Sequence, residues 1–351
     1  MISERHRSEL LDCIRAVAIL MVVLFHVMIE YPRDTLGPIG EWFYRYGFLG
    51  VDVFFPLSGY LITLYLIRNN DGPGVQVFFM RRVFRIVPLY LLVSALYFIG
   101  AELTNEDPGI ERGWITLLFL TGWFILIDGR EAVPFTITWS LSVEEFAYLI
   151  CGFTFLLLKR QTVTALLGLV ILSAIIRSWL LIEEHPFNVV YYFPPARLDS
   201  VFLGSLTAIA VTRGNHKIVL ILGAIVLAGA ILASYLSTPA FQIVLFPAIA
   251  VGVCLSITLI EVYAKEFTSL PTRWIGRFGF YAYFIYLFHY FIIYGLQVIL
   301  KRLSIDLEPL ELTLFTFFIV MPCAVFSWRY FESPLIGYGR FLEKRTHKSS
   351  V

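Results

Sequence analysis

The chain has 351 residues, of which 58% are hydrophobic and 15% are charged. Soluble domains carry about 25% charged residues, so this composition excludes a fold surrounded by water and indicates one whose apolar side chains face lipid. The formal net charge of +1 gives no electrostatic basis for binding nucleic acid. We therefore expect a multi-pass membrane protein whose surroundings are the lipid bilayer.

A membrane-spanning helix needs about 20 mostly apolar residues, and the sequence contains about ten such runs. We predict an all-α, polytopic helical bundle that forms a single domain over residues 1–335, with a short basic tail over residues 336–351. A further run, Trp114–Ile127, is too short to span and contains Gly122, which favours a re-entrant or interfacial segment. The predicted spans are Leu11–Tyr31, Phe48–Arg68, Val83–Ala101, Trp139–Leu158, Val163–Ile182, Leu198–Thr212, Ile218–Leu236, Phe241–Val262, Ile275–Leu300 and Leu312–Tyr330.

The positions of the basic residues predict the orientation of the chain. With ten spans and a cytoplasmic amino terminus, most of the 27 lysines and arginines fall in cytoplasmic segments, as the positive-inside rule requires. An eleventh span would place Lys159, Arg160 and the basic tail outside. We therefore expect both termini in the cytoplasm. Because the first run carries Arg15 and His26 and lacks a small-residue cleavage site, we expect a span there and not a signal peptide.

The first span carries two ionisable side chains, and such groups at membrane depth are functional candidates. Arg15 and His26 are eleven residues apart, so on a helix they share one face and differ in height by about 16 Å. Arg15 then lies near the cytoplasmic surface and His26 in the outer half of the bilayer. Arg15 alone could be a snorkelling anchor, and His26 alone could form a hydrogen bond between helices.

The fourth span begins outside and contains the adjacent carboxylates Glu144 and Glu145. Because this span runs antiparallel to the first, its carboxylates lie at a depth similar to that of His26. We favour Glu144 as the partner of His26, since it shares a helical stripe with Ser140 and Tyr148; Glu145 stays an alternative. A carboxylate beside an imidazole sets its tautomer and stabilises the imidazolium, as a general base requires.

Further polar residues are predicted in the same outer half, and their shared depth favours a polar cavity there. Single pairs among them, such as Arg197 with Asp199, could instead be structural. The candidate cavity residues are Asp52, Ser58, Trp139, Arg197, Asp199 and His289.

The cytoplasmic side of the third span offers a different chemistry. Arg81, Arg82 and Arg85 enter it just before Pro88, and their spacing places the guanidinium groups on neighbouring turns. Guanidinium suits bidentate phosphate binding, although a positive-inside anchor is the alternative. A phosphate-binding inner end and an acid/base centre nearer the outside would fit a long polyanionic donor with its reactive group at the far end.

Several of these residues lie in runs that resemble, in family order, motifs of the membrane acyltransferase 3 family. The runs are Leu11–Leu20 with His26, Phe54–Gly59, Arg82–Pro88, Trp139–Glu145, Arg197–Ser200 and the His289 segment. The resemblance implies transfer of an acyl group, usually acetyl, from cytoplasmic acyl-CoA to a hydroxyl of an extracytoplasmic or lipid-linked carbohydrate. It also implies a multi-pass protein of the bacterial inner membrane.

By this resemblance, His26 would be the catalytic base, with Glu144 and Glu145 as its carboxylates. Acyl-CoA would be a co-substrate and not a bound cofactor, and Arg15, Arg81, Arg82 and Arg85 would bind it. Direct transfer and an acyl-His26 intermediate are both open. The donors left open for the oxyanion of the reaction are Ser58, Trp139 and a backbone amide near Gly59. The four cysteines form no cluster with histidine, so we expect no metal site.

Two other functions remain possible from the residues alone. A proton-coupled transporter could use His26, Glu144, Asp52 and His289 as a relay across the bundle. A lipid or glycan binder without catalysis could use the same cavity for recognition. Neither needs the arginines at the inner end of the third span.

Overall fold

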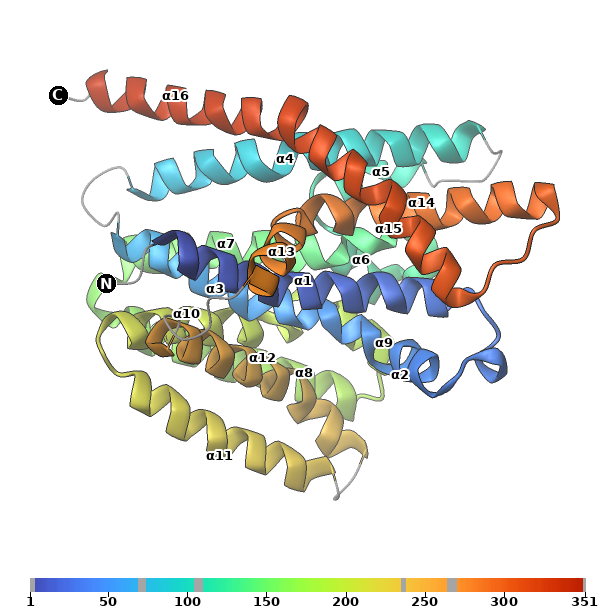
Figure 1. The fold of residues 1–351 in the computed structure, drawn as a ribbon. Coiled ribbons are helices and arrows are strands. Elements are labelled where there is room, and N and C mark those ends of the chain that lie inside the picture. Colours follow the sequence, from blue (N-terminus) through green and yellow to red (C-terminus); the bar gives the residue numbers. More distant parts are fainter. Residues whose placement is uncertain (1–3, 69–73, 104–109, 235–237, 264–269, 350–351) are drawn as a thin grey trace. The chain divides into compact units, whose positions relative to one another are not determined.

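The computed structural model describes residues 4–68, 74–103, 110–234, 238–263 and 270–349 of the chain (Figure 1). Every regular element within these ranges is a helix. The chain divides into two compact units: unit 1 comprises residues 1–54, 80–93 and 264–351, and unit 2 comprises residues 55–79 and 94–263. The all-α, polytopic class predicted from the sequence is confirmed.

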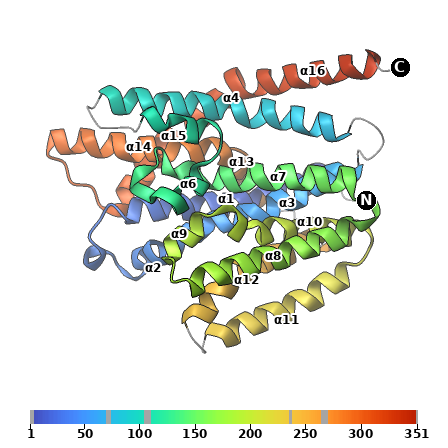
Figure 2. The ribbon, with the colours of Figure 1, turned by 180° about the vertical axis from the view of Figure 1, so that it is seen from behind.

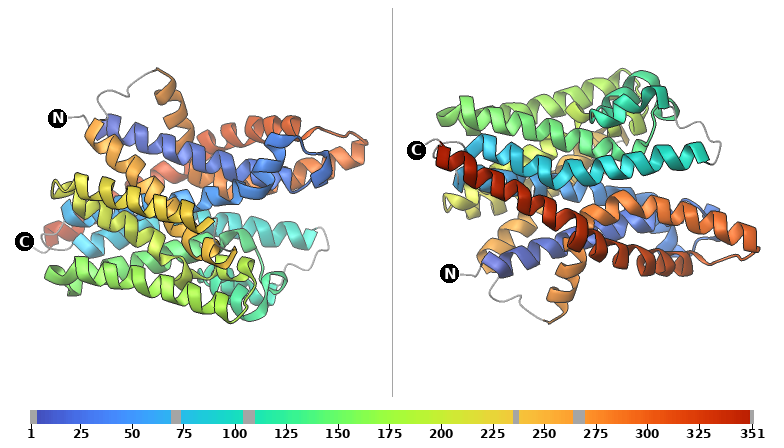
Figure 3. Two further views of the ribbon diagram at one scale, coloured as in Figure 1. Left: turned by 90° about the horizontal axis from the view of Figure 1, so that it is seen from below. Right: turned by 90° about the horizontal axis from the view of Figure 1, so that it is seen from above.

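Unit 1 is built around α1, the helix that carries Arg15 and His26. Helix α1 packs against α2, α13, α14 and α15, and α14 also packs against α15 (Figures 1 and 3). A π-helical turn, Trp328–Glu332, joins α15 to α16. The helices of unit 1 are α1 (Glu4–Met28), α2 (Pro38–Tyr46), α13 (Leu270–Phe280), α14 (Ala282–Leu303), α15 (Pro309–Ser327) and α16 (Ser333–Ser349), with 3-10 turns Arg33–Thr35 and Gly47–Leu49.

Glycines let α13 approach the backbone of α1 closely. A Cβ atom placed on Gly279 would lie 1.7 Å from the carbonyl oxygen of Asp12, and one on Gly276 would lie 2.7 Å from that of Glu9. Only hydrogen fits in these spaces, since real Cβ atoms do not approach oxygen so closely. The two glycines therefore define where α13 crosses α1, next to the segment that positions Arg15.

Unit 2 contains the remaining helices, and α3 and α4 contribute residues to both units. Helix α10 packs against α8 and α12, and α11 packs against α12 (Figure 2). The helices are α3 (Gly50–Arg68), α4 (Gly74–Leu103), α5 (Gly113–Leu117), α6 (Thr121–Asp128), α7 (Trp139–Leu157), α8 (Thr162–Ile182), α9 (Phe187–Tyr192), α10 (Leu198–Thr212), α11 (His216–Ser234) and α12 (Thr238–Tyr263), with 3-10 turns Ile110–Arg112, Arg130–Ala132, Thr136–Thr138, Lys159–Gln161 and Pro194–Ala196.

A second glycine crossing brings α10 against the unit 2 part of α3. A Cβ atom on Gly59 would lie 1.9 Å from the carbonyl oxygen of Val201, and one on Gly204 would lie 1.9 Å from that of Pro56. The two backbones are therefore in direct contact. This contact places the segment that carries Ser58 beside the first turns of α10, where two candidate residues, Arg197 and Asp199, begin the helix.

The predicted spans agree well with the observed helices. Among the described residues, eight helical segments are long and apolar enough to cross a membrane, and two shorter apolar helices, Leu198–Thr212 and His216–Leu232, match the sixth and seventh predicted spans. The run Trp114–Ile127 forms two short helices, α5 and α6, with a break at Phe119, whose φ is +58°. It is therefore not a further span, as predicted.

One predicted span needs correction, and the predicted end of another lies outside the described residues. The ninth span, predicted as Ile275–Leu300, is two helices, because α13 ends at Phe280 and α14 begins at Ala282. The close crossing of α13 with α1 gives that helix its own direction, which hydropathy along the sequence does not reveal. The predicted end of the seventh span, Leu236, lies outside the described residues. Most of the predicted basic tail belongs to α16.

The α1–α13 crossing gives a stability prediction. Gly279→Ala should lower the free energy of unfolding by about 1–3 kcal/mol, because its methyl group would overlap the Asp12 carbonyl and force the helices apart. Thermal unfolding of the purified protein in detergent measures this change. The matched control is Gly295→Ala in α14, where a Cβ atom would meet nothing within 4 Å. Equal melting temperatures for the two variants would contradict the crossing.

Candidate functional site

The candidate residues fall into two groups, one in each unit. Unit 1 holds Asp52, which is buried in the first turn of α3, together with the two candidate histidines and the four arginines predicted to bind acyl-CoA. The other members of this group are Arg15, His26, Arg81, Arg82, Arg85 and His289. Unit 2 holds Ser58, Trp139, Glu144, Glu145, Arg197 and Asp199.

Two imidazoles meet in unit 1. His26 Nδ1 lies 3.2 Å from His289 Nε2, and the ring centroids are 4.8 Å apart with the planes inclined by 63°. His26, on α1, is half-buried, and His289, on α14, is fully buried. The sequence placed both residues in the outer half of the bilayer but did not predict that they would be partners.

The neighbouring carbonyl oxygens determine which nitrogen carries the proton in each neutral ring. His289 Nδ1 lies 3.0 Å from the Ile285 carbonyl oxygen, which can only accept, so this Nδ1 donates and Nε2 carries the lone pair. His26 Nδ1 faces two acceptors, His289 Nε2 and the Val22 carbonyl oxygen at 2.9 Å, so it also carries a proton. The lone pair of the neutral His26 ring is therefore on Nε2, which is the basic nitrogen of this tautomer.

Arg15 has a carboxylate partner that the sequence reasoning overlooked. Its guanidinium forms a salt bridge with Asp12, one turn earlier on α1. Asp12 is 6% exposed, and its carbonyl oxygen is also the atom that Gly279 approaches. An acidic residue inside the first predicted span was the signal that could have identified it. Arg15 is thus held by its own helix near the α1–α13 crossing.

The three arginines of α4 differ in their surroundings. Arg81 Nε and Nη2 donate to the two carboxylate oxygens of Glu343 in α16, at 2.8 and 2.6 Å. Arg82 and Arg85 lie one turn apart on α4, and the charge of Arg85 interacts with the carboxylates of Asp12 and Glu332. The sequence grouped the three arginines as one fork, and it did not predict that Glu343 of α16 would pair with the first of them.

Glu144 accepts two side-chain hydrogen bonds within unit 2. The Ser58 hydroxyl donates to its Oε1 at 3.0 Å, and the Tyr148 hydroxyl donates to its Oε2 at 2.5 Å. Each carboxylate oxygen therefore receives a hydrogen bond that holds its orientation. Tyr148 is buried and lies one turn after Glu144 on α7, as the predicted stripe required. The preference for Glu144 over Glu145 as partner of His26 stays a prediction.

One of the oxyanion donors left open by the sequence is removed by the fold. Helix α3 continues through Gly59, so its amide donates within the helix to the carbonyl four residues earlier. The close approach of Val201 occupies the space where a side chain on Gly59 would be. Ser58 and Trp139 remain the candidates of that group.

Aromatic rings surround Arg197, whose side chain is fully buried in unit 2. Its Cζ lies 3.3 Å from the ring centroid of Phe246, 4.9 Å from that of Tyr191 and 5.8 Å from that of Phe55. Such contacts stabilise a cation through the negative faces of the rings. We call these three rings the Arg197 cage.

Trp139 connects the Arg197 cage to a half-buried tyrosine. Its ring centroid lies 6.1 Å from that of Phe55, 4.6 Å from that of Tyr191 and 5.1 Å from that of Tyr192. Burial raises the pKa of the Tyr192 phenol, which therefore stays protonated at neutral pH and can donate a hydrogen bond. The exposed guanidinium of Arg130 lies 6.0 Å from the Tyr192 ring centroid.

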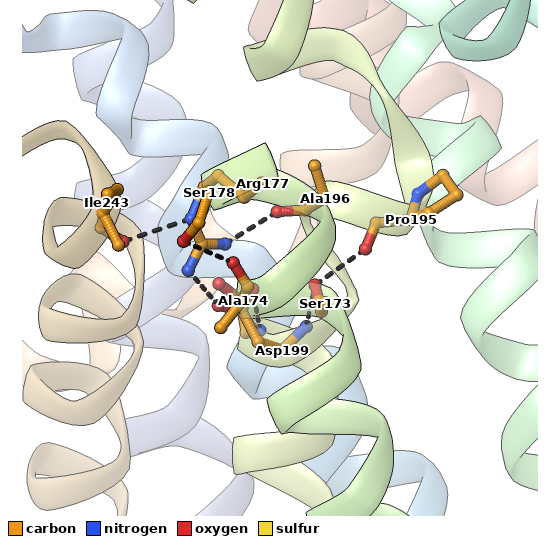
Figure 4. Close-up of polar contacts among 9 residues, drawn as sticks. Ser173, Ala174, Arg177, Ser178, Pro195, Ala196, Asp199 and Ile243 are labelled. Atoms are coloured by element: carbon orange, nitrogen blue, oxygen red, sulfur yellow. Dashed lines mark hydrogen bonds and ion pairs between the residues drawn. The ribbon is translucent and has the colours of Figure 1, made fainter. Parts of the chain in front are cut away.

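Asp199 forms a salt bridge with Arg177 of α8, a partner that the sequence did not predict, and its charge also acts on Arg197. The distance from Arg177 Nη2 to Asp199 Oδ2 is 2.7 Å, and both side chains are about 1% exposed (Figure 4). Arg177 was not among the candidate residues, although an arginine inside the predicted fifth span is a signal of the same kind as Arg15. Partner choice here depends on how α8 packs against α10.

Comparisons with known proteins identify relatives of the chain. A profile of a family described as an acyltransferase domain, acyltransferase 3, matches residues 9–329. The peptidoglycan O-acetyltransferase OatA of Listeria monocytogenes is 26% identical over 361 residues, which cover 93% of this chain and 55% of that protein. A putative peptidoglycan O-acetyltransferase of Bacillus subtilis is 27% identical over 218 residues, which cover 57% of this chain and 32% of the relative.

A putative O-acetyltransferase of Staphylococcus aureus is 26% identical over 216 residues, which cover 56% of this chain and 34% of that protein. The chain thus spans about half the length of OatA, and its alignments with the other two cover about a third of each protein. No solved structure matches the chain.

The proton positions in the imidazole pair can be measured directly. In protein labelled with ¹⁵N at its 6 histidines, His26 and His289 should both show a protonated Nδ1 and an unprotonated Nε2 at neutral pH. The carbonyl oxygens of Val22 and Ile285 are the cause. Solid-state ¹⁵N spectra report the tautomer, and His26→Gln and His289→Gln assign the signals. A protonated Nε2 on neutral His289 would contradict the arrangement.

Proposed function

This chain belongs to the acyltransferase 3 family, and we propose that it is an integral-membrane O-acyltransferase. It moves an acyl group, acetyl in the first instance, from cytoplasmic acyl-CoA to a hydroxyl of an extracytoplasmic or lipid-linked carbohydrate. The family match over residues 9–329 supports the reaction type, and the relatives named as peptidoglycan O-acetyltransferases support a glycan acceptor. The helices long enough to cross a membrane support a multi-pass membrane protein, and we propose the bacterial inner membrane as its location.

The observation that carries the proposal is the tautomer of His26, that is, which ring nitrogen carries the proton. Its Nδ1 proton is directed at His289 and the Val22 carbonyl oxygen, so the lone pair of the ring is on Nε2. A base on a helix in the bilayer, oriented by partners on the other side of its ring, is the arrangement that general-base catalysis requires. His289 then has a positioning role toward His26, in addition to its predicted place in the cavity.

The proposed chemical step uses this nitrogen. His26 Nε2 accepts the proton of the acceptor hydroxyl as its oxygen attacks the thioester carbonyl carbon, and the imidazolium then returns the proton to the departing thiolate. Glu144 is the carboxylate assigned to stabilise the imidazolium, and Ser58 and Tyr148 hold its two oxygens. Transfer through an acyl-His26 intermediate balances equally well and stays an alternative.

The donor and acceptor are assigned to different groups of residues. Arg82 and Arg85 bind the phosphates of acyl-CoA through charge-assisted hydrogen bonds, and Arg15 assists. Because Glu343 already engages Arg81, we assign Arg81 a supporting role that depends on α16. The acceptor carbohydrate is assigned to the region of Trp139 and the Arg197 cage, since aromatic rings and hydrogen-bond donors suit sugar binding.

The catalytic role of His26 is tested by label transfer. His26→Ala should insert and fold but transfer label from radiolabelled acetyl-CoA to glycan acceptors 10²–10⁴-fold more slowly than the wild type, because the base is lost. The matched control, His185→Ala, changes a histidine in the loop after α8 and should retain wild-type activity. Size-exclusion chromatography confirms that each variant is folded.

The same assay separates the proposal from its rivals. Label moves to the acceptor only if the protein is an enzyme, whereas a proton-coupled transporter or a glycan-binding protein leaves acetyl-CoA intact. Wild-type transfer rates in His26→Ala would remove the catalytic assignment of this residue.

The donor assignment predicts a selective binding defect. Arg82→Ala combined with Arg85→Ala should weaken acyl-CoA binding by at least about tenfold, since each lost contact to a charged phosphate is worth about 1.5–3 kcal/mol. Binding of acyl-CoA to the protein in detergent measures this effect, and saturating acceptor should not restore it. Lys159→Ala with Arg160→Ala, which removes two exposed charges after α7, is the control. Unchanged donor affinity would make the two arginines topological anchors only.

A further inference from the structure

Arg177 joins three separate elements of unit 2. Its Nε donates to the Ile243 carbonyl oxygen of α12 at 3.1 Å, its Nη1 donates to the Ala196 carbonyl oxygen at 2.7 Å, and its Nη2 pairs with Asp199 at 2.7 Å (Figure 4). The side chain is fully buried. Each of the three nitrogens of the guanidinium therefore has a partner, and the three partners come from α12, the 3-10 turn Pro194–Ala196 and α10.

A serine on the preceding turn of α8 acts on the same segment. The Ser173 hydroxyl donates to the Pro195 carbonyl oxygen at 2.7 Å and accepts a hydrogen bond from the Asp199 amide at 3.2 Å (Figure 4). Together, Ser173 and Arg177 hold the chain on both sides of Arg197. We call these two side chains the α8 clamp.

A proline explains why α12 offers a carbonyl group to the clamp. Pro247 lies inside α12 and has no amide hydrogen, so the carbonyl of Ile243, four residues earlier, lacks its helical donor. Arg177 supplies that donor. The residue just before this proline is Phe246, whose ring centroid lies 3.3 Å from the Arg197 Cζ. The clamp therefore joins the segment that carries Arg197 to the helix that carries the ring beneath it.

We propose that Arg177 is a positioning residue that keeps Arg197 over Phe246, and that Ser173 assists it. The Arg197 guanidinium is then already in place when the acceptor carbohydrate binds. This inference rests on the proposed acyl transfer and on the assignment of the acceptor to the Trp139 and Arg197 region. A cation held on a ring at a defined distance presents its charge in one place, and substrate-binding groups depend on such support.

The proposal requires a defect in acceptor binding and not in donor binding. Arg177→Lys keeps a positive charge but cannot reach three acceptors in a planar fork, so the Michaelis constant for the acceptor should rise at least about tenfold. Ser173→Ala removes two hydrogen bonds that flank Arg197 without removing a charge, and it should raise the same constant about threefold to tenfold. The Michaelis constant for acetyl-CoA should stay unchanged in both variants.

Ser178→Ala is the matched control for this experiment. Ser178 lies beside Arg177 on α8, but its hydroxyl donates only to the Ala174 carbonyl oxygen of its own helix among the hydrogen bonds of the described residues (Figure 4). Its two Michaelis constants should equal those of the wild type. Melting temperatures are measured for all variants, and Ser173→Ala serves as the decisive variant if Arg177→Lys does not fold.

A double-mutant comparison tests whether the clamp acts through Arg197. In protein that carries Arg197→Lys, addition of Ser173→Ala should raise the acceptor constant by less than twofold, because the side chain that it positions is already altered. Full additivity of the two effects, or equal rises of the donor and acceptor constants, would overturn the proposal. A wild-type protein that transfers no label would instead overturn the proposed function, and the clamp's role in acyl transfer with it.

Discussion

A polar or charged side chain inside a bilayer is costly unless another group of the protein satisfies it, and this constraint organises both units of the chain. In unit 1 it accounts for the contact of His26 with His289 and the salt bridge of Arg15 with Asp12. In unit 2 it accounts for the hydroxyl groups on Glu144. The side chains proposed to take part in the reaction are therefore also held in one orientation by hydrogen bonds and salt bridges.

Close contacts between helix backbones fix the relative positions of the helices that carry these polar groups. Gly279 allows α13 to reach the backbone of α1 beside Asp12, and Gly59 and Gly204 allow α10 to reach the backbone of α3. Helices that touch through glycine have little freedom to slide, because any Cβ atom at the crossing would overlap a carbonyl oxygen. A polar residue next to such a crossing is held in place by it, as Ser58 is by its neighbour Gly59.

Proline contributes in the opposite way, by leaving a carbonyl group without its helical donor. Pro247 frees the Ile243 carbonyl in α12, and the guanidinium of Arg177 fills the vacancy. In water such a carbonyl could bind solvent, but within the bilayer a donor must come from the protein. Pro247 and the buried Arg177 would each be unfavourable alone, but the hydrogen bond from Arg177 to the Ile243 carbonyl satisfies both groups.

The sequence by itself determined the all-α membrane fold, the approximate spans and the family motifs, because hydropathy and helical spacing are properties of one chain segment. Only the tertiary structure decided the partners: Asp199 with Arg177, His26 with His289, and the break that separates α13 from α14. Spacing along a helix defines the face and the height of a side chain, but it does not say which face of another helix will lie opposite. That choice depends on close packing between segments far apart in the sequence.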